Sequence, residues 1–141
     1  MRFEFLFLGK TKEKFLAQGI DHFLARLRRY ATVEIRIIKE KSWSPQESEA
    51  KIREEEGTLL LSRVHRPSLL VVLDRAGKQV SSEELAGMLE KWEDGGQRCV
   101  TFLLGGPLGL PPSLPSAADV CLALSRMTLT HEMARLVLVE Q

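Results

Sequence analysis

The stretch "SLLVVL", Ser68 to Leu73, decides the fold class of this chain. It is a continuous apolar run that follows Pro67 and precedes the turn-forming sequence "DRAGK". Such a run is typical of a central strand in a parallel sheet, because both faces of that strand are buried. The sequence therefore predicts a sheet that is covered by helices on both sides.

Strand and helix patterns alternate along the rest of the chain. Short apolar runs between turn signals predict strands at 2–8, 33–38, 68–73, 99–104 and 120–125. Apolar residues at helical spacing predict helices over 12–29, 44–64, 81–95 and from about 130 to the end of the chain. This order predicts an α/β fold, a mostly parallel sheet with helices on both faces, formed by residues 1–141 as a single domain.

The starts of three helices carry capping signals. Ser44 with Glu47, and Ser81 with Glu84, have the spacing of capping boxes, in which a serine and a glutamate satisfy each other's free backbone amides. A threonine, either Thr128 or Thr130, is the expected cap of the last helix.

Composition and charge exclude several classes of protein. Apolar residues make up 44% and charged residues 28% of the 141 residues, as in a soluble globular protein. The net charge of +1 gives no global basic field, so contact with a nucleic acid would have to come from local patches or from an oligomer. Basic residues do cluster locally, and each cluster is interpreted as a solvated face: Lys10, Lys12 and Lys14; Arg26, Arg28 and Arg29; Lys39 and Lys41.

No membrane segment and no metal site are expected. The apolar runs are far too short to span a bilayer. The histidines are widely separated and have no cysteines or carboxylates arranged around them as ligands. Cys99 and Cys121 lie in expected strands without CxxC spacing, which indicates buried reduced thiols and a cytoplasmic setting.

Three loops form the candidate site. Ligands of parallel sheets bind beyond the carboxyl ends of the strands, where loops leave the sheet. The loops that leave the expected strands there are Asp74–Lys78, Gly105–Pro112 and Arg126–Thr130.

The middle loop contains the glycine cluster "FLLGGPLGLP", Phe102 to Pro111. A phosphate-binding loop must open directly into a helix, and Pro107, Pro111 and Pro112 oppose that. The glycines either let a flat ligand approach the backbone or turn the chain, and the cluster favours ligand contact.

His131 lies at the end of the third loop, and Arg135 follows it by one helical turn. Two interpretations are open. The pair binds an anionic or polar substrate in the cleft, or it consists of a helix-capping residue and a surface charge.

Several motifs in fixed order resemble one enzyme family. They are a strand ending in "VLD" with a glycine three residues later, then "FLLGGPLGL", then "LALSRMTLTHEMARLVLVEQ". Together with the opening "FLGKTKEKF" they resemble the ribosomal RNA large-subunit methyltransferase H family, of the SPOUT class of knotted methyltransferases.

The resemblance implies a C-terminal trefoil knot, a cytoplasmic homodimer and S-adenosylmethionine as the cofactor. It implies methylation of N3 of a pseudouridine in 23S ribosomal RNA on the assembled ribosome. The cofactor contacts it implies are Leu73, Gly105, Leu124, Ser125, Arg126, Met127, Thr128 and Leu129.

The N3 proton of the acceptor base must leave during transfer, so a base or an anion-stabilising group is needed. His131 and Arg135 are the candidate catalytic residues, with Arg135 better suited to anion contact. The chain ends at Gln141, whereas the resembled family continues with a tail that carries an aromatic residue and a histidine. The alternative is therefore a catalytically impaired cofactor-binding or ribosome-binding module.

Overall fold

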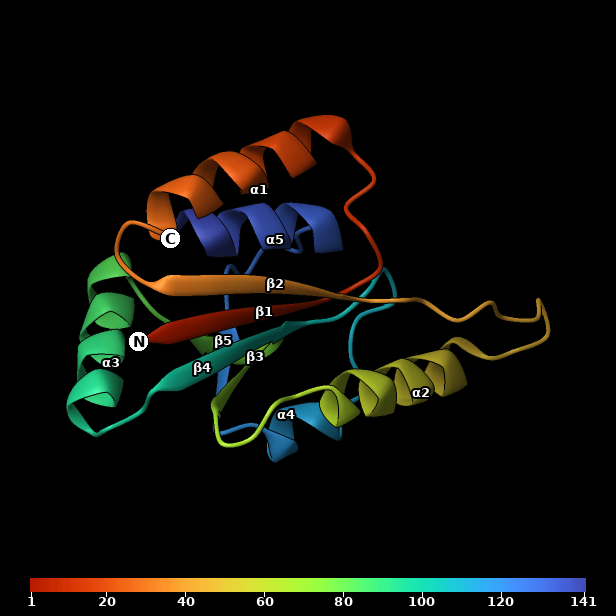
Figure 1. Ribbon diagram of the computed structural model, residues 1–141. Coiled ribbons are helices and arrows are strands. Elements are labelled where there is room, and N and C mark those ends of the chain that lie inside the picture. The colour runs from red at the N-terminus through yellow and green to blue at the C-terminus, as the bar shows by residue number, and fades with distance from the viewer.

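Five parallel strands form one sheet in the computed structural model, which describes residues 1–141 (Figure 1). The strands are β1 (Arg2–Leu8), β2 (Thr32–Ile38), β3 (Leu69–Gln79), β4 (Cys99–Leu104) and β5 (Val120–Ala123), in the order β2-β1-β4-β3-β5. Leu70, Val71 and Val72 of β3 are completely buried. The sequence predicted a central strand of a parallel sheet, buried on both faces, and this prediction is confirmed.

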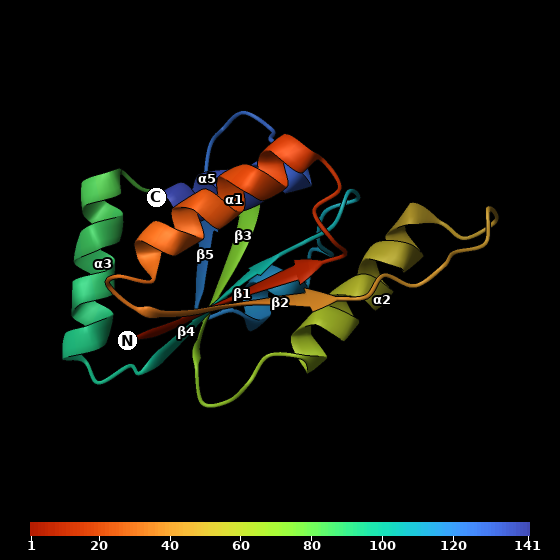
Figure 2. The ribbon, with the colours of Figure 1, turned by 45° about the horizontal axis from the view of Figure 1, so that its top comes forward.

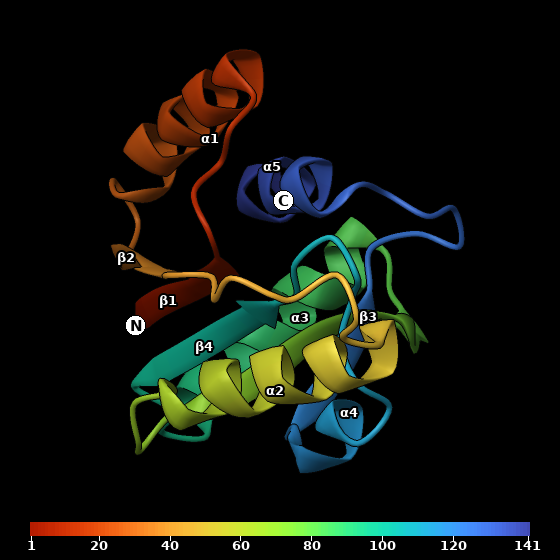
Figure 3. The same ribbon diagram turned by 90° about the vertical axis from the view of Figure 1, so that its right-hand side faces the viewer.

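Helices cover both faces of the sheet (Figure 3). The helices α1 (Lys14–Leu27), α3 (Ser82–Asp94) and α5 (His131–Glu140) pack on the face that Val71 and Leu73 share. The helices α2 (Glu49–Ser62) and α4 (Leu114–Ala117) pack on the face of Leu70 and Val72. Alternate side chains of each inner strand thus belong to different cores.

The start of α2 corrects the sequence prediction. The helix begins at Glu49, and the hydroxyl of Ser48 accepts a hydrogen bond from the Lys51 amide at 3.1 Å. Ser44 instead lies in a preceding turn, where its hydroxyl accepts from the Gln46 amide at 3.3 Å. The prediction of a capping box at Ser44 is therefore wrong, because the Ser44 hydroxyl accepts from the Gln46 amide within its own turn.

The other capping predictions are confirmed. The Ser81 hydroxyl accepts from the Glu84 amide at 3.0 Å, and the Glu84 carboxylate accepts from the Ser81 amide at 2.7 Å. Thr130 caps α5 by accepting from the Met133 amide at 3.3 Å. Cys99 and Cys121 are free thiols, and each is half-buried.

The sequence "DRAGK" is not a simple turn, because β3 continues through it to Gln79. Leu73 and Lys78 both pair with Leu122 of β5, so the residues between them bulge out of the ladder. The Asp74 carboxylate holds the bulge by accepting from the Ala76 amide at 3.0 Å. The expected loop at 74–78 is therefore a bulge within a strand.

A buried arginine anchors α5 to the carboxyl end of β1. The chain leaves β5 and loops back so that α5 lies beside α1 (Figure 2). Arg135 has no exposed surface, and its guanidinium donates to the Leu8 carbonyl at 2.6 Å and to the Thr11 hydroxyl at 3.0 Å. The same group lies 4.7 Å from the centre of the Phe7 ring, a cation–π contact.

The same turn of α5 caps α1. The Glu132 carboxylate accepts hydrogen bonds from the amides of Lys12 at 2.8 Å and Glu13 at 3.0 Å, at the start of α1. Burial alone would raise the pKa of Glu132, but these bonds and the charges of His131 and Arg135 outweigh it. The pKa of Glu132 is therefore lowered.

On the opposite face, α2 packs tightly against the loop after β4. A Cβ atom on Gly57 would lie 2.6 Å from Pro111 Cγ, so only glycine allows this approach. Beside it, Glu56 is buried, and its Oε1 atom has no hydrogen-bond partner. Burial, followed by the charge of Glu40, raises the pKa of Glu56.

None of the helices is long and apolar enough to cross a membrane. No three side chains of the types histidine, cysteine, aspartate and glutamate are grouped so that they could hold a metal ion.

Replacing Glu132 with glutamine removes the charge that caps α1 while keeping the shape of the side chain. At pH 7 we expect a loss of about 1–2 kcal/mol in the free energy of unfolding, measured in urea. A carboxyl whose pKa is lowered by folding stabilises the protein above its unfolded pKa, and this contribution disappears as the pH falls through the folded pKa. The variant and the wild type should therefore converge below pH 4.5, the ordinary value for glutamate. A difference that does not depend on pH would contradict this assignment.

Replacing Glu56 with glutamine should change the free energy of unfolding in the opposite direction. Folding raises the pKa of this carboxyl, so its favourable contribution holds below the unfolded pKa and is lost as the pH rises through the folded pKa. At pH 7 we expect the variant to gain on the order of 1 kcal/mol in the free energy of unfolding, and this gain should shrink at pH 4. A variant less stable than the wild type at pH 7 would show that the Glu56 charge is compensated.

Candidate functional site

A cavity of about 850 Å³ opens beyond the carboxyl ends of β3, β4 and β5. Its volume lies in the range of small-molecule and cofactor pockets. Its walls come from the β3 bulge, the glycine loop after β4 and the segment that leads from β5 into α5. The cavity therefore lies where the parallel topology predicts the binding site.

The glycine loop forms the wall beside β4 and folds back on itself. The Gly109 amide donates to the Gly106 carbonyl at 3.0 Å, which closes a turn with Pro107 at its second position. Gly109 has φ +79°, a left-handed conformation that favours glycine. A Cβ atom on Gly105 would lie 2.9 Å from Leu110 Cγ and 3.0 Å from the Gly109 carbonyl carbon. The cluster therefore makes a turn whose own backbone lines the cavity.

The predicted cofactor residues gather at this cavity with one exception. The lining includes Leu73, Gly105, Leu124, Ser125, Met127, Thr128 and Leu129. Arg126 is exposed and does not line the cavity. The Ser125 hydroxyl accepts from the Met127 amide at 2.9 Å, which fixes the bend of the segment, and the Met127 side chain is exposed.

His131 lines the cavity at the first turn of α5. Its imidazole Nε2 lies 3.8 Å from the Glu132 carboxylate. Burial, followed by the positive charge of Arg135, lowers the pKa of His131 below the ordinary 6.5. The imidazole is therefore neutral at pH 7 and can accept a proton from a group in the cavity.

Arg135 does not reach the cavity, which corrects the expectation that it contacts substrate. Its guanidinium is fully enclosed by β1 and the start of α1, where it binds the Leu8 carbonyl and the Thr11 hydroxyl. A residue one turn after His131 lies deeper along the helix, under α1 rather than at the cleft. Arg135 acts on the site by fixing α5 and through its charge near His131.

The cavity also contains residues that were not predicted. Arg53 reaches it from α2, and Ala134 reaches it from α5. The approach of α2 depends on the contact between Gly57 and Pro111, which joins segments far apart in the sequence. No local pattern carries that information.

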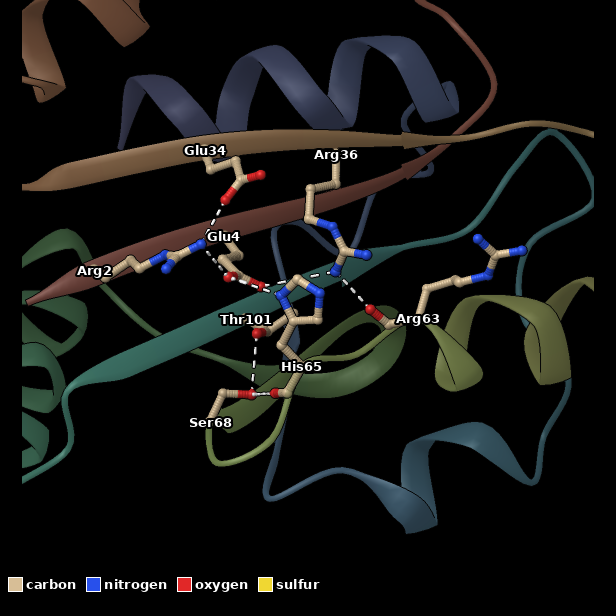
Figure 4. A network of polar contacts seen from close by, with 8 residues as sticks. All are labelled: Arg2, Glu4, Glu34, Arg36, Arg63, His65, Ser68 and Thr101. Atoms are coloured by element: carbon tan, nitrogen blue, oxygen red, sulfur yellow. Dashed lines mark hydrogen bonds and ion pairs between the residues drawn. The ribbon is translucent and has the colours of Figure 1, made fainter.

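A second cluster of charges lies away from the cavity, on the α2 side of β1 and β2 (Figure 4). The buried Glu4 carboxylate lies 2.9 Å from Arg2, 3.3 Å from His65 and 3.9 Å from Arg36. The Arg36 guanidinium also donates to the Arg63 carbonyl at 2.5 Å. These contacts tie the end of α2 to the sheet, so the cluster is structural.

Comparison with known proteins identifies the family of the chain. The sequence profile of a family described as "Predicted SPOUT methyltransferase" matches residues 1–141. The chain is 47% identical to the protein named ribosomal RNA large subunit methyltransferase H of Desulfotalea psychrophila, and 40% identical to its namesake in Geotalea uraniireducens. It is 39% identical to the protein of that name in Desulforamulus reducens. Each alignment covers 100% of this chain and 90% of the relative. The chain belongs to the ribosomal RNA large subunit methyltransferase H family of SPOUT methyltransferases.

Proposed function

We propose that this protein uses S-adenosylmethionine to methylate N3 of a pseudouridine in 23S ribosomal RNA of the assembled ribosome. The observation that carries the proposal is the cavity at the strand ends, where Leu73, Gly105 and the residues of the segment 124–129 other than Arg126 come together. The names of the relatives support ribosomal RNA as the substrate.

The residues of the cavity fit this cofactor. Leu73, Leu124 and Leu129 offer apolar surface for a flat heterocycle, and the backbone of the glycine loop offers hydrogen-bonding groups. The glycine loop itself carries no basic side chain, and the positive groups of the cavity, which are Arg53, Arg75 and the N-terminus of α5, come from other elements.

When bound, the cofactor supplies a methyl group that is activated by its attachment to a sulfonium. The chain then has two tasks. The loops hold the acceptor base in line with that methyl group, and a base in the site takes the proton from N3. The neutral imidazole of His131 lines the cavity and is the group that we propose accepts this proton.

We further propose that residues 1–141 act as one methyltransferase domain, with the C-terminal trefoil knot, the homodimer and the cytoplasmic location implied by the family. The support for the knot is the SPOUT family to which the chain belongs.

Two measurements test the function. S-adenosylmethionine is titrated into the protein by calorimetry, and labelled methyl transfer is then assayed on ribosomes that lack the modification. We expect binding and stoichiometric transfer to the pseudouridine. Binding without transfer would favour the alternative, a cofactor-binding module, and the absence of binding would overturn the proposal.

Replacing Gly105 with alanine should weaken cofactor binding by at least about tenfold, because the new Cβ atom would push Leu110 and Gly109 out of the cavity wall. The matched control is Gly87→Ala in α3, where a Cβ atom meets nothing within 4 Å. We expect the control to bind normally and to be slightly more stable, since alanine favours helix. Equal affinity of the Gly105 variant and the control, measured by calorimetry, would remove the glycine loop from the site.

Replacing His131 with asparagine should lower kcat by about 10²–10⁴-fold, the usual contribution of a general base. Cofactor affinity should change far less. Because the pKa of His131 is lowered, the wild-type rate should rise with pH below 6.5 and level off above it. The variant should lack that limb of the profile. A variant with an unchanged kcat, or with the same pH profile, would show that another group takes the proton.

A further inference from the structure

Exposed lysines gather where β1 and β2 end. Lys10 and Lys12 follow β1, and Lys39 and Lys41 follow β2. We refer to these four residues as the β1–β2 rim. All four are exposed, and none has a carboxylate within ion-pair distance.

The sheet register brings the two pairs of lysines together. Leu8 pairs with Ile38, and the Gly9 amide donates to the Ile38 carbonyl at 2.8 Å, so the segments that carry the lysines leave the sheet side by side. On the other side of β1, Phe7 pairs with Leu104, the residue before Gly105. The β1–β2 rim therefore lies next to the glycine loop that walls the cavity (Figure 1).

Two carboxylates near the rim are engaged elsewhere or turned inward, whereas the exposed Glu13 follows Lys12 directly. Glu132 caps the start of α1. Glu40 is half-buried, and its carboxylate lies against Gly9 rather than beside a lysine. Across the cavity, Arg75 is exposed and also unpaired. Although the whole chain has 20 basic and 19 acidic residues, this end of the sheet presents free positive charge.

We propose that the β1–β2 rim binds the phosphate backbone of the RNA substrate and so directs the acceptor base into the cavity. This inference rests on the proposed function and extends it from the cavity to the surface beside it. Mobile lysine ammonium groups suit a line of phosphates, because they act as point charges and release counterions without requiring one fixed geometry.

The chain offers a matched control for net charge. Arg26, Arg28 and Arg29 are equally exposed and form no ion pair, but they lie at the end of α1 that leads into the start of β2. That end is opposite the cavity, because the helix runs back along the parallel strands (Figure 1).

The test compares two triple variants. One is Lys10→Gln, Lys39→Gln and Lys41→Gln, which removes three positive charges, the same number as in the control. The other is Arg26→Gln, Arg28→Gln and Arg29→Gln. Binding to ribosomes lacking the modification and to deproteinised 23S ribosomal RNA is measured over a range of salt concentrations, and kcat, KM and cofactor affinity are measured in parallel.

For the rim variant we expect KM and the RNA dissociation constant to rise by about tenfold or more. The slope of log affinity against log salt should fall by about one for each phosphate contact removed. Both kcat at saturation and cofactor affinity should stay unchanged. The arginine variant should behave as the wild type.

If RNA binding weakens equally in both variants, the effect comes from net charge alone and the proposal is overturned. The proposal is also overturned if RNA binding weakens in neither variant. A defect on ribosomes but not on deproteinised RNA would assign the rim to a ribosomal protein and also overturn it. If the wild type binds RNA through the rim but transfers no methyl group, the proposed function fails while this inference stands.

Discussion

The placement of the last helix depends on the buried guanidinium of Arg135. Burying a charged group is costly unless every donor finds an acceptor and the charge is compensated. Here the carbonyl of Leu8, the hydroxyl of Thr11 and the face of Phe7 compensate the guanidinium in part, while its Nε atom has no hydrogen-bond partner. Because the Leu8 carbonyl lies at the end of β1, its hydrogen bond with Arg135 fixes α5 relative to the sheet.

Other features follow from this position. Within one turn of α5, His131 lines the cavity, Glu132 caps α1 and Arg135 anchors the helix. Burial lowers the pKa of His131, and the charge that anchors the helix lowers it further. The stability of the fold and the charge state of His131 are therefore coupled through a residue that does not line the cavity.

The sequence predicted the elements whose signals are local. A run such as "SLLVVL" needs no distant partner to indicate burial on both faces, and the box of Ser81 and Glu84 is complete within four residues. Prediction failed where two local signals competed or where a contact joined distant segments. Ser44 and Ser48 both precede plausible first turns, and only the packing of α2 selects Ser48. The bulge at 74–77 depends on β5, which is about fifty residues away in the chain. Likewise, the helical spacing of His131 and Arg135 placed both on one side of α5, but it could not show that α1 covers the second.

The parallel topology explains how a nearly neutral chain can carry a local surface of unpaired positive charge. All five strands end on one edge, so every segment that leaves a strand contributes to the same end of the molecule. The lysines after β1 and β2 reach that edge through short segments that follow directly on paired strands, whereas Arg26, Arg28 and Arg29 are carried to the other edge by the return of α1. Basic clusters that look alike in the sequence therefore differ in position by the length of a strand. The strand-to-helix alternation that builds the cavity is thus the same feature that separates the charges beside it from those on the opposite edge.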